Sequence, residues 1–257
     1  MDKAEAVAEM IVHAPKVVVF TGAGISTESG IPDFRSPGGL WSRFDPNELN
    51  FQNFLASEDA REKYWAMSTE MWRVIRNAEP NPGHRAIAEL YELGKVDCVI
   101  TQNVDNLHQK SGIPENAVIE LHGTSRWVAC LDCGQRFPRE EVQARVDAGE
   151  KAPRCGRCRG LLKQATISFG QAMPPQATRE AEERSAACQL CLIAGTSLVV
   201  YPAAQMPLIA KRSGAGLVIV NLSATPHDDY ADVIMHEKVG EALPRIAAAV
   251  RAKLAKT

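Results

Sequence analysis

Six short apolar runs, rich in β-branched residues, constrain the fold of this chain more than any other feature of its sequence. They are the runs 16–20, 96–101, 118–121, 190–194, 217–221 and 232–235. Runs of this length and composition are typical of strands buried on both faces. Helical patterns lie between them, over 58–77, 84–93, 174–188, 202–213 and 240–254. Because strands that alternate with helices form parallel sheets, the sequence predicts an α/β protein with a doubly wound parallel sheet.

Two stretches do not follow this alternation and are predicted to be insertions. The stretch 38–77 is rich in Trp, Phe and Asn and ends in a helical pattern, and the stretch 126–163 contains paired cysteines. At 257 residues, one large domain with a small satellite is favoured over two equal domains. We therefore predict a sheet-forming domain over 1–37, 78–125 and 164–257 that carries both insertions.

The charge and hydropathy of the chain exclude several classes of protein. Lys plus Arg is 29 and Asp plus Glu is 31, so the net charge of −2 gives no field for gripping nucleic acid, and we expect no direct nucleic-acid binding. The longest apolar stretches, at 190–194 and 199–200, are too short to span a bilayer. Residues 1–13 lack the apolar core of a signal peptide. We expect a cytoplasmic protein without a membrane partner.

Four of the seven cysteines form two C-x2-C pairs that are separated by 21 residues. Such pairs supply four thiolates to one tetrahedral zinc, and no position is left for water, so the predicted site is structural. Redox activity of either pair is the alternative. The predicted ligands are Cys130, Cys133, Cys155 and Cys158. We interpret the three other cysteines as core packing residues, namely Cys98, Cys188 and Cys191.

The first apolar run leads into a glycine turn formed by Gly22, Ala23 and Gly24. Small residues at such a turn let backbone N–H groups approach a pyrophosphate. The next glycine is Gly30, so the G-x-G-x-x-G spacing is not met and a standard dehydrogenase is disfavoured. The turn therefore indicates a nucleotide site, with a tight turn that binds nothing as the alternative.

Two further polar groups follow the glycine turn. The loop 30–36 combines Asp33, Phe34 and Arg35, residue types that bind ligands when they lie on loops. The alternative is a core Phe34 beside a surface ion pair of Asp33 and Arg35. The second group, 101–108, places amides and a carboxylate at the end of a strand, which is the edge where open α/β sheets bind ligands. We expect this group to form a hydrogen-bonding pocket for an amide or a ribose.

His122 follows the run 118–121 and is expected at the same edge of the sheet. A lone histidine is more often structural than catalytic, but the two candidate ligand loops beside it favour a functional role. A neutral imidazole near pH 7 is suited to general-base work on a hydroxyl. Residues 195–197 form one more turn of small residues at this edge.

Taken in chain order, these motifs resemble those of the sirtuin (Sir2) family. They are GAGIS at 22–26, GIPDFR at 30–35, TQNVD at 101–105, LHG at 121–123, the four paired cysteines and GTS at 195–197. The resemblance extends from residue 16 to about residue 244. It implies an NAD-dependent protein lysine deacylase with a Rossmann-like large domain, a small zinc domain and a cofactor loop within the helical insertion.

The resemblance also implies a role for individual residues. His122 and Asn103 would be catalytic, and the acyl-lysine peptide would add as a strand along Ile167, Phe169 and Gly170. Gln171 and Ser168 depart from the usual acid and aromatic of this segment, so the peptide preference is open. The residues implied to bind NAD are Gly22, Ala23, Gly24, Ile31, Phe34, Arg35, Gln102, Asn103, Asp105, Gly195, Ser197, Asn221 and Val239.

In the reaction that the resemblance implies, nicotinamide leaves the ribose and the amide oxygen of an acyl-lysine attacks it. His122 then takes a proton from a ribose hydroxyl, and water releases lysine and O-acyl-ADP-ribose. Mono-ADP-ribosyl transfer to protein is one alternative, because it uses the same cofactor pocket. A non-catalytic, NAD-binding zinc module is the other alternative.

The resemblance sharpens the expected acyl preference. Relatives that prefer acidic acyl groups carry a Tyr and an Arg where a gapless count places Ser68 and Met71, and a smaller Ala in place of Thr27. A carboxylate buried beside Met71 would have no partner, which is costly. We therefore predict an acyl pocket that accepts acetyl groups, leaves longer neutral chains open and rejects acidic ones. The alternative is that Arg61 or Arg73 replaces the missing cation.

Overall fold

The computed structural model describes residues 2–45 and 47–256, and its centre is a six-stranded parallel sheet. The strand order is β3-β2-β1-β7-β8-β9. The strands are β1 (Val17–Thr21), β2 (Val96–Thr101), β3 (Val118–Glu120), β7 (Leu190–Ala194), β8 (Gly216–Val220) and β9 (Val233–Met235). Each of the six predicted strands is present and is displaced by at most one residue at either end, so the predicted fold class is confirmed.

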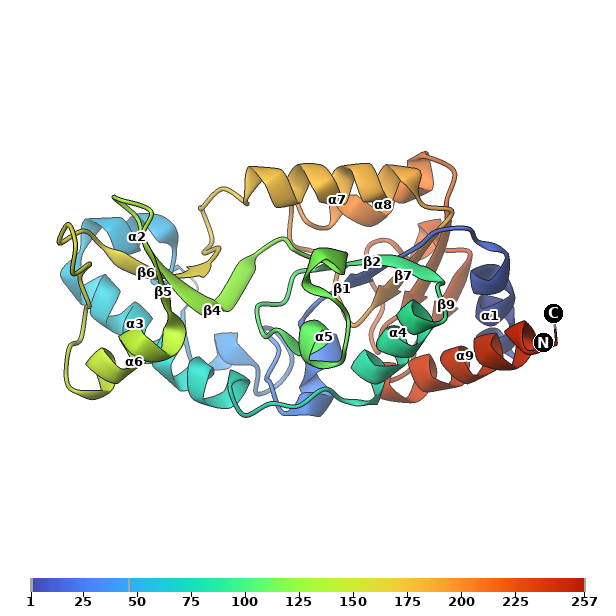
Figure 1. The fold of residues 1–257 in the computed structure, drawn as a ribbon, viewed down its shortest axis with the longest axis horizontal. Coiled ribbons are helices and arrows are strands. Elements are labelled where there is room, and N and C mark those ends of the chain that lie inside the picture. Colours follow the sequence, from blue (N-terminus) through green and yellow to red (C-terminus); the bar gives the residue numbers. More distant parts are fainter. Residues whose placement is uncertain (1, 46, 257) are drawn as a thin grey trace.

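Helices cover both faces of this sheet (Figure 1). One face carries α1 (Lys3–His13), α4 (Pro82–Glu92) and α9 (Val239–Leu254), and the other carries α7 (Pro175–Ala187) and α8 (Gln205–Arg212). Shorter pieces connect them, namely η1 (Ala23–Ser29), η2 (Leu40–Ser42), α5 (Leu107–Lys110), η3 (Glu115–Ala117) and η4 (Asp228–Tyr230). Helix α1 was not predicted from the sequence.

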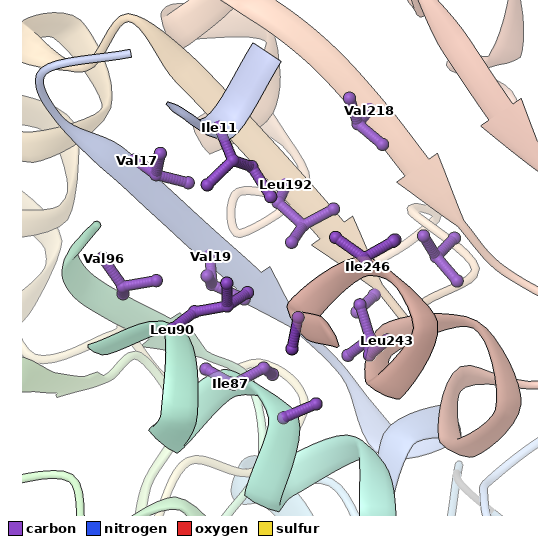
Figure 2. Close-up of a cluster of buried hydrophobic side chains, with 14 of the residues drawn as sticks. Ile11, Val17, Val19, Ile87, Leu90, Val96, Leu192, Val218, Leu243 and Ile246 are labelled. Carbon is purple, nitrogen blue, oxygen red and sulfur yellow. The ribbon is translucent and has the colours of Figure 1, made fainter. Parts of the chain in front are cut away.

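The alternation of side chains along β1 explains why both faces need helices. Val17 and Val19 lie in the apolar cluster under α1, α4 and α9, whereas Val18 and Phe20 lie in the cluster under α7 and α8. Successive side chains of a strand point to opposite faces, so an all-apolar strand must be covered on both. Figure 2 shows the first cluster, where helical and strand side chains meet.

A second, antiparallel sheet lies at the far end of the molecule from the parallel sheet (Figure 1). Its strand order is β5-β4-β6, with β4 (Gly123–Cys130), β5 (Arg136–Pro138) and β6 (Leu162–Thr166). The helix α6 (Arg139–Asp147) directly follows β5 in the chain. The sequence did not predict this sheet or α6. The helices α2 (Phe51–Ala56) and α3 (Glu58–Ile75) pack against it, and α3 corresponds to the predicted helix 58–77.

The two insertions share one apolar cluster. Phe54 on α2 and Trp65 on α3 are buried together with Val128 and Leu162 of the antiparallel sheet. The Trp65 indole also donates a hydrogen bond to the Leu162 carbonyl oxygen over 3.3 Å. We propose that 38–77 and 126–163 act as a single small domain, and their exact boundaries stay a prediction.

Two observations bear on the remaining sequence expectations. Cys98, Cys188 and Cys191 are buried in the cluster under α7 and α8, as predicted, and burial raises the pKa of the Cys98 thiol to about 12. Among the residues that the structure describes, no helix is both long enough and apolar enough to cross a membrane.

The packing of α9 gives a stability prediction. Leu243 is fully buried between the sheet and α4 (Figure 2), so Leu243→Ala should lower the free energy of unfolding by about 2–5 kcal/mol. Ala248 lies on the exposed face of the same helix, so Ala248→Ser should change the free energy of unfolding by less than about 0.5 kcal/mol. Chemical denaturation of both variants checks this, and equal losses would contradict the assigned packing.

Candidate active site

Five of the predicted site residues gather at one edge of the parallel sheet because each lies just after the end of a strand. Gly22 follows β1, Gln102 follows β2 and Gly195 follows β7 directly. Asn221 follows β8, and His122 lies two residues beyond β3. The carboxyl ends of parallel strands all face the same way, so five separate loops meet there.

The glycine turn and the loop after β7 touch backbone to backbone. The Gly24 N–H donates to the Gly195 carbonyl oxygen over 2.8 Å, and a Cβ on Gly24 would lie 2.8 Å from that oxygen. A Cβ on Gly22 would lie 2.7 Å from the Thr196 Cβ. Gly195 has a φ of +62°, which side chains rarely allow. Only glycines fit here, and η1 begins at Ala23 directly above this contact.

A buried hydrogen-bond network lies beneath the turn. Asn103 donates from Nδ2 to the Ser26 Oγ and to the Gly22 carbonyl oxygen, both over 3.1 Å. Ser26 in turn donates to Asp105 Oδ2 over 2.7 Å. Burial raises the pKa of the Asp105 carboxyl, while the N–H of Leu107 and the Ser26 hydroxyl oppose that rise. The network holds the Asn103 amide in one orientation.

Two buried histidines extend this network. The rings of His84 and His108 lie 5.0 Å apart, and His108 Nε2 lies 2.9 Å from the Thr21 hydroxyl. Burial lowers the pKa of His84 to about 4 and that of His108 well below its ordinary value, so both are neutral at pH 7. Their Nδ1 atoms have no hydrogen-bond partner among the described residues.

His122 is half-buried and its ring is fixed by the backbone. Its Nδ1 lies 3.1 Å from the Gln102 carbonyl oxygen. A carbonyl oxygen can only accept, so Nδ1 carries the proton and the Nε2 lone pair is free. Burial lowers the pKa of the imidazole more than the bond to Gln102 raises it. The structure therefore holds a neutral imidazole with one basic nitrogen at the edge of the sheet.

The loop 30–36 does not contain the ion pair that was one reading of its sequence. Asp33 Oδ1 accepts from the backbone N–H groups of Arg35 and Ser36, over 3.0 and 2.8 Å. Phe34 is 39% exposed rather than in the core. Its ring lies 5.2 Å from that of Trp41. The carboxylate shapes the loop and leaves the aromatic ring and the guanidinium facing outward.

The loop and the predicted peptide segment line one cavity. The Trp41 ring lies 5.9 Å from that of Phe169, and both line a cavity of about 410 Å³ together with Arg35, Asn47 and Asn50. The Phe169 carbonyl oxygen accepts from the Phe51 N–H over 2.9 Å. The aromatic contact brings the cofactor loop and the peptide segment together.

The peptide segment starts directly beside His122. The Ile167 N–H donates to the His122 carbonyl oxygen over 2.9 Å. Gln171, which replaces the usual acid, accepts from the Ser168 N–H over 3.2 Å. Gly170 has a φ of +77° and turns the chain away. The hydrogen bond to the Gln171 side chain thus stabilises the turn formed by residues 168–171.

The other residues implied to bind NAD lie around this edge. Ile31 is buried in a small apolar cluster with Leu107, and Ser197 is exposed. Asn221 donates from Nδ2 to the Ser223 carbonyl oxygen over 2.7 Å, and Val239 is the buried first residue of α9. The structure places these residues, and their contacts with NAD stay a prediction.

Sequence reasoning gave no individual role to Ser26, Thr196, His84 or His108, although His108 belongs to the group 101–108 that was expected to form a pocket. Ser26 and Thr196 stand inside the quoted motifs, and the Thr196 hydroxyl accepts from Gln102 Nε2 over 3.0 Å. A hydroxyl within two residues of a turn glycine was the signal that could have found both. The histidines lie on helices far apart in the chain, so only the fold brings them together.

The four paired cysteines meet in one cluster. Their Sγ atoms all lie within 4.8 Å of one another, with Cys130–Cys158 at 3.5 Å and Cys133–Cys155 at 3.8 Å. Four sulfurs about 2.3 Å from a tetrahedral zinc lie about 3.8 Å apart. In both pairs the residue after the second cysteine has a positive φ, 70° at Gly134 and 64° at Arg159, and donates its N–H to the first cysteine's carbonyl. This geometry fits a zinc ion and no disulfide.

Fold and site together define a nucleotide-binding class of α/β protein with a four-cysteine cluster that could hold a metal ion. The Sir2 family model matches residues 22–202, so the chain belongs to the Sir2 family. An NAD-dependent protein deacetylase of Rhodopseudomonas palustris is 48% identical over 239 residues, which cover 93% of this chain and 94% of that protein.

Two solved structures extend the comparison. A complex of a Sir2 protein with a deacetylated p53 peptide and 3′-O-acetyl ADP ribose is 37% identical, with a TM-score of 0.89 over 95% of this chain and 97% of that chain. A Sir2 homologue in complex with NAD is 38% identical, with a TM-score of 0.86 over 97% of this chain and 94% of that chain.

The ionisation of His122 gives a pH prediction. Since only the neutral imidazole is a base, and burial lowers its pKa, activity should persist below the ordinary histidine pKa of about 6.5 and fall at lower pH. The acid limb of kcat/KM against pH checks this, with NAD affinity measured over the same range as the control. A midpoint at or above about pH 7 would contradict the assignment.

Proposed function

We propose that this protein removes acetyl groups from lysine side chains of proteins and consumes NAD, giving nicotinamide and O-acetyl-ADP-ribose. The observation that carries the proposal is the environment of His122: its Nδ1 is bonded to the Gln102 carbonyl oxygen, which leaves Nε2 as the basic nitrogen, and its own carbonyl oxygen accepts from the Ile167 N–H of the peptide segment. The names of the relatives agree with it, because the R. palustris protein is a deacetylase and a similar fold holds a deacetylated peptide.

The residues of the site fit NAD as a co-substrate. The contact between Gly24 and Gly195 leaves only small groups where a pyrophosphate would lie, and Phe34 and Arg35 of the loop 30–36 would also bind the cofactor. Gln102 would hold the nicotinamide ribose, and Asn103, Ile31 and Asp105 the nicotinamide. NAD supplies the electrophilic ribose carbon when nicotinamide leaves. Ser197, Asn221 and Val239 would hold the adenosine end.

His122 would act as the base that takes a proton at Nε2 from a ribose hydroxyl. Its Nδ1–H stays on the Gln102 carbonyl oxygen, which keeps the ring in one orientation. The acyl-lysine peptide would pair with Ile167, Phe169 and Gly170, which reads the backbone of the substrate and tolerates many sequences. The Asn103 amide, fixed by Gly22 and Ser26, would position the amide of the nicotinamide.

The contacts of α3 support the preference for neutral acyl groups. Met71 packs on the apolar cluster that contains Ile31, and Ser68 is buried on another face, where its hydroxyl donates to Gln164 over 2.9 Å. Arg61 donates to the Phe54 carbonyl oxygen over 3.0 Å, and Arg73 pairs with Asp147 over 3.1 Å. Both arginines that could have replaced the missing cation are engaged elsewhere.

Arg139 is a cation near Ser68 that the sequence did not reveal. It comes from α6, and its Nη1 donates to the Ser68 Oγ over 3.0 Å. Its guanidinium lies over the rings of Trp65 and Trp72 and is fully buried. Its other terminal nitrogen donates to Gln143, so both Nη groups already bond to side chains of the small domain and of α3.

The alternatives differ in their products. Mono-ADP-ribosyl transfer would leave an ADP-ribose adduct on protein, and a module that only binds NAD would consume none. The free base nitrogen of His122 disfavours the binding module, because recognition alone has no use for a base. The seven thiols, none in a disulfide, favour a reducing compartment and hence the predicted cytoplasmic location.

The function is tested by incubating the protein with NAD and one peptide that carries acetyl, butyryl or succinyl lysine. Mass spectrometry should find O-acetyl-ADP-ribose, and kcat/KM should be highest for a neutral acyl group. His122→Ala should lower kcat by more than about 10²–10⁴-fold while NAD binding survives in part, because ribose contacts are lost with the base. A succinyl value equal to or above the acetyl value would overturn the acyl preference, and near-normal turnover of His122→Ala would overturn the base.

We also propose one structural zinc at Cys130, Cys133, Cys155 and Cys158. The sulfur distances fit it, and no site is left for a catalytic water. The metal would tie the two hairpins of the small domain together, since the apolar cluster there is small compared with those of the parallel sheet.

Metal analysis should therefore find about one zinc per chain. Cys155→Ser should lose the metal and unfold the small domain, seen as a change in the fluorescence of Trp65, Trp72 and Trp127. Cys98→Ala, which removes a thiol from the parallel sheet instead, should keep its zinc. A fully active preparation without zinc would contradict the proposal.

A further inference from the structure

The predicted base and the predicted peptide segment are joined by one short stretch of backbone. The Ile167 N–H donates to the His122 carbonyl oxygen over 2.9 Å, and the next pair in the ladder is Gly123 opposite Thr166. Beyond this pair the register between β4 and β6 shifts, and regular pairing resumes only at Val128. The contact at Gly123 is therefore isolated from the rest of the antiparallel sheet.

Gly123 stands where no other residue fits. Its φ is +72°, and a Cβ built there would lie 2.1 Å from the Ala165 carbonyl oxygen. It would also lie 3.1 Å from the Ala165 carbonyl carbon and 3.3 Å from the Thr166 Cα. All three are backbone atoms, which cannot turn aside as a flexible side chain does. A side chain at this position must therefore push β6 and β4 apart.

The parallel sheet holds the other side of this contact. The Leu121 N–H donates to the Thr101 carbonyl oxygen over 2.9 Å, and the His122 ring is bound to the Gln102 backbone. His122 is thus anchored to the end of β2, whereas Ile167 continues from β6 of the antiparallel sheet. A separation of the strands at Gly123 changes the distance between the base and the peptide segment.

We propose that Gly123 is a positioning residue: the lack of a side chain there sets the distance between His122 and the segment that binds the acyl-lysine peptide. The inference rests on the proposed function and adds a residue that acts through the backbone. A larger residue moves the bound peptide away from the base, while the NAD-binding loops after β1 and β7 keep their contacts.

The chain offers a matched control for Gly123→Ala. Gly94 has a φ of +71°, almost the same as that of Gly123, but a Cβ built there meets nothing within 4 Å. Gly94→Ala therefore introduces the same backbone strain without the steric conflict. Gly94 follows α4 and precedes β2 at the opposite end of that strand from the site.

In the test, both variants are compared with the unmodified protein for kcat, peptide KM and NAD affinity. Gly123→Ala should lower kcat/KM for an acetyl-lysine peptide on the order of 10²-fold, as a misplacement of about 1 Å does, and should leave NAD affinity within about twofold. The NMR signal of the His122 imidazole should also move. Gly94→Ala should match the unmodified protein in all of these quantities.

The outcomes separate this inference from the proposed function. If Gly123→Ala keeps the kcat/KM of Gly94→Ala, the positioning role is wrong even though the enzyme is a deacetylase. If the unmodified protein produces no O-acetyl-ADP-ribose, the proposed function fails instead. Should Gly123→Ala not fold, Ile167→Pro removes the N–H that bonds to His122 but also changes a predicted peptide contact, so the His122 imidazole NMR signal is compared without peptide; a shifted signal with intact NAD binding would support the inference, and an unchanged signal with unchanged kcat would overturn it.

Discussion

One row of the parallel ladder sets the position of the entire site. Residues in this row are paired across all six strands without a break, so that every strand reaches the same line. The row consists of Glu120, Thr101, Thr21, Ala194, Val220 and Met235. The loops that leave this line begin side by side, although those after β1 and β7 come from segments more than a hundred residues apart. A shift of one strand by one residue would turn its side chains to the opposite face and move its loop.

On β1, this row is also where the strand changes from apolar to polar. Thr21 donates its hydroxyl to Thr101 over 2.8 Å and lies beside His108, whereas the residues before it in β1 are apolar on both faces. Each buried nitrogen without a partner costs about 1–3 kcal/mol, and both His84 and His108 carry one. The burial of the two apolar clusters on either face of the sheet offsets this cost, so the protein can keep two neutral, buried histidines next to the site.

The parts that the sequence predicted are those in which local pattern and tertiary environment agree. The six strands are buried on both faces, so apolar runs marked them to within one residue. Helix α1 carries Ala4, Val7, Ala8 and Ile11 on its buried face, but four of its other positions are acidic or basic and three of its apolar residues are alanines. The antiparallel sheet gave no alternating pattern, because β5 has three residues and β4 carries a register shift. The motifs located the site. Contacts such as that of Trp41 with Phe169 depend on the conformation of irregular loops, which the sequence pattern does not predict.

The small domain shows why the proposed zinc and α3 would be needed together. Its interior holds Arg139 and Lys163, and neither has a carboxylate within ion-pair distance among the described residues. Burial lowers the pKa of Lys163 to about 7, and its ammonium donates to the Thr166 carbonyl oxygen beneath the ring of Tyr64. Buried cations oppose folding, so the aromatic rings of α3 and the four cysteines of the proposed zinc site would supply stability that the short strands do not provide. Since β6 runs from this interior straight into Ile167, whatever stabilises the small domain also holds the peptide segment against His122.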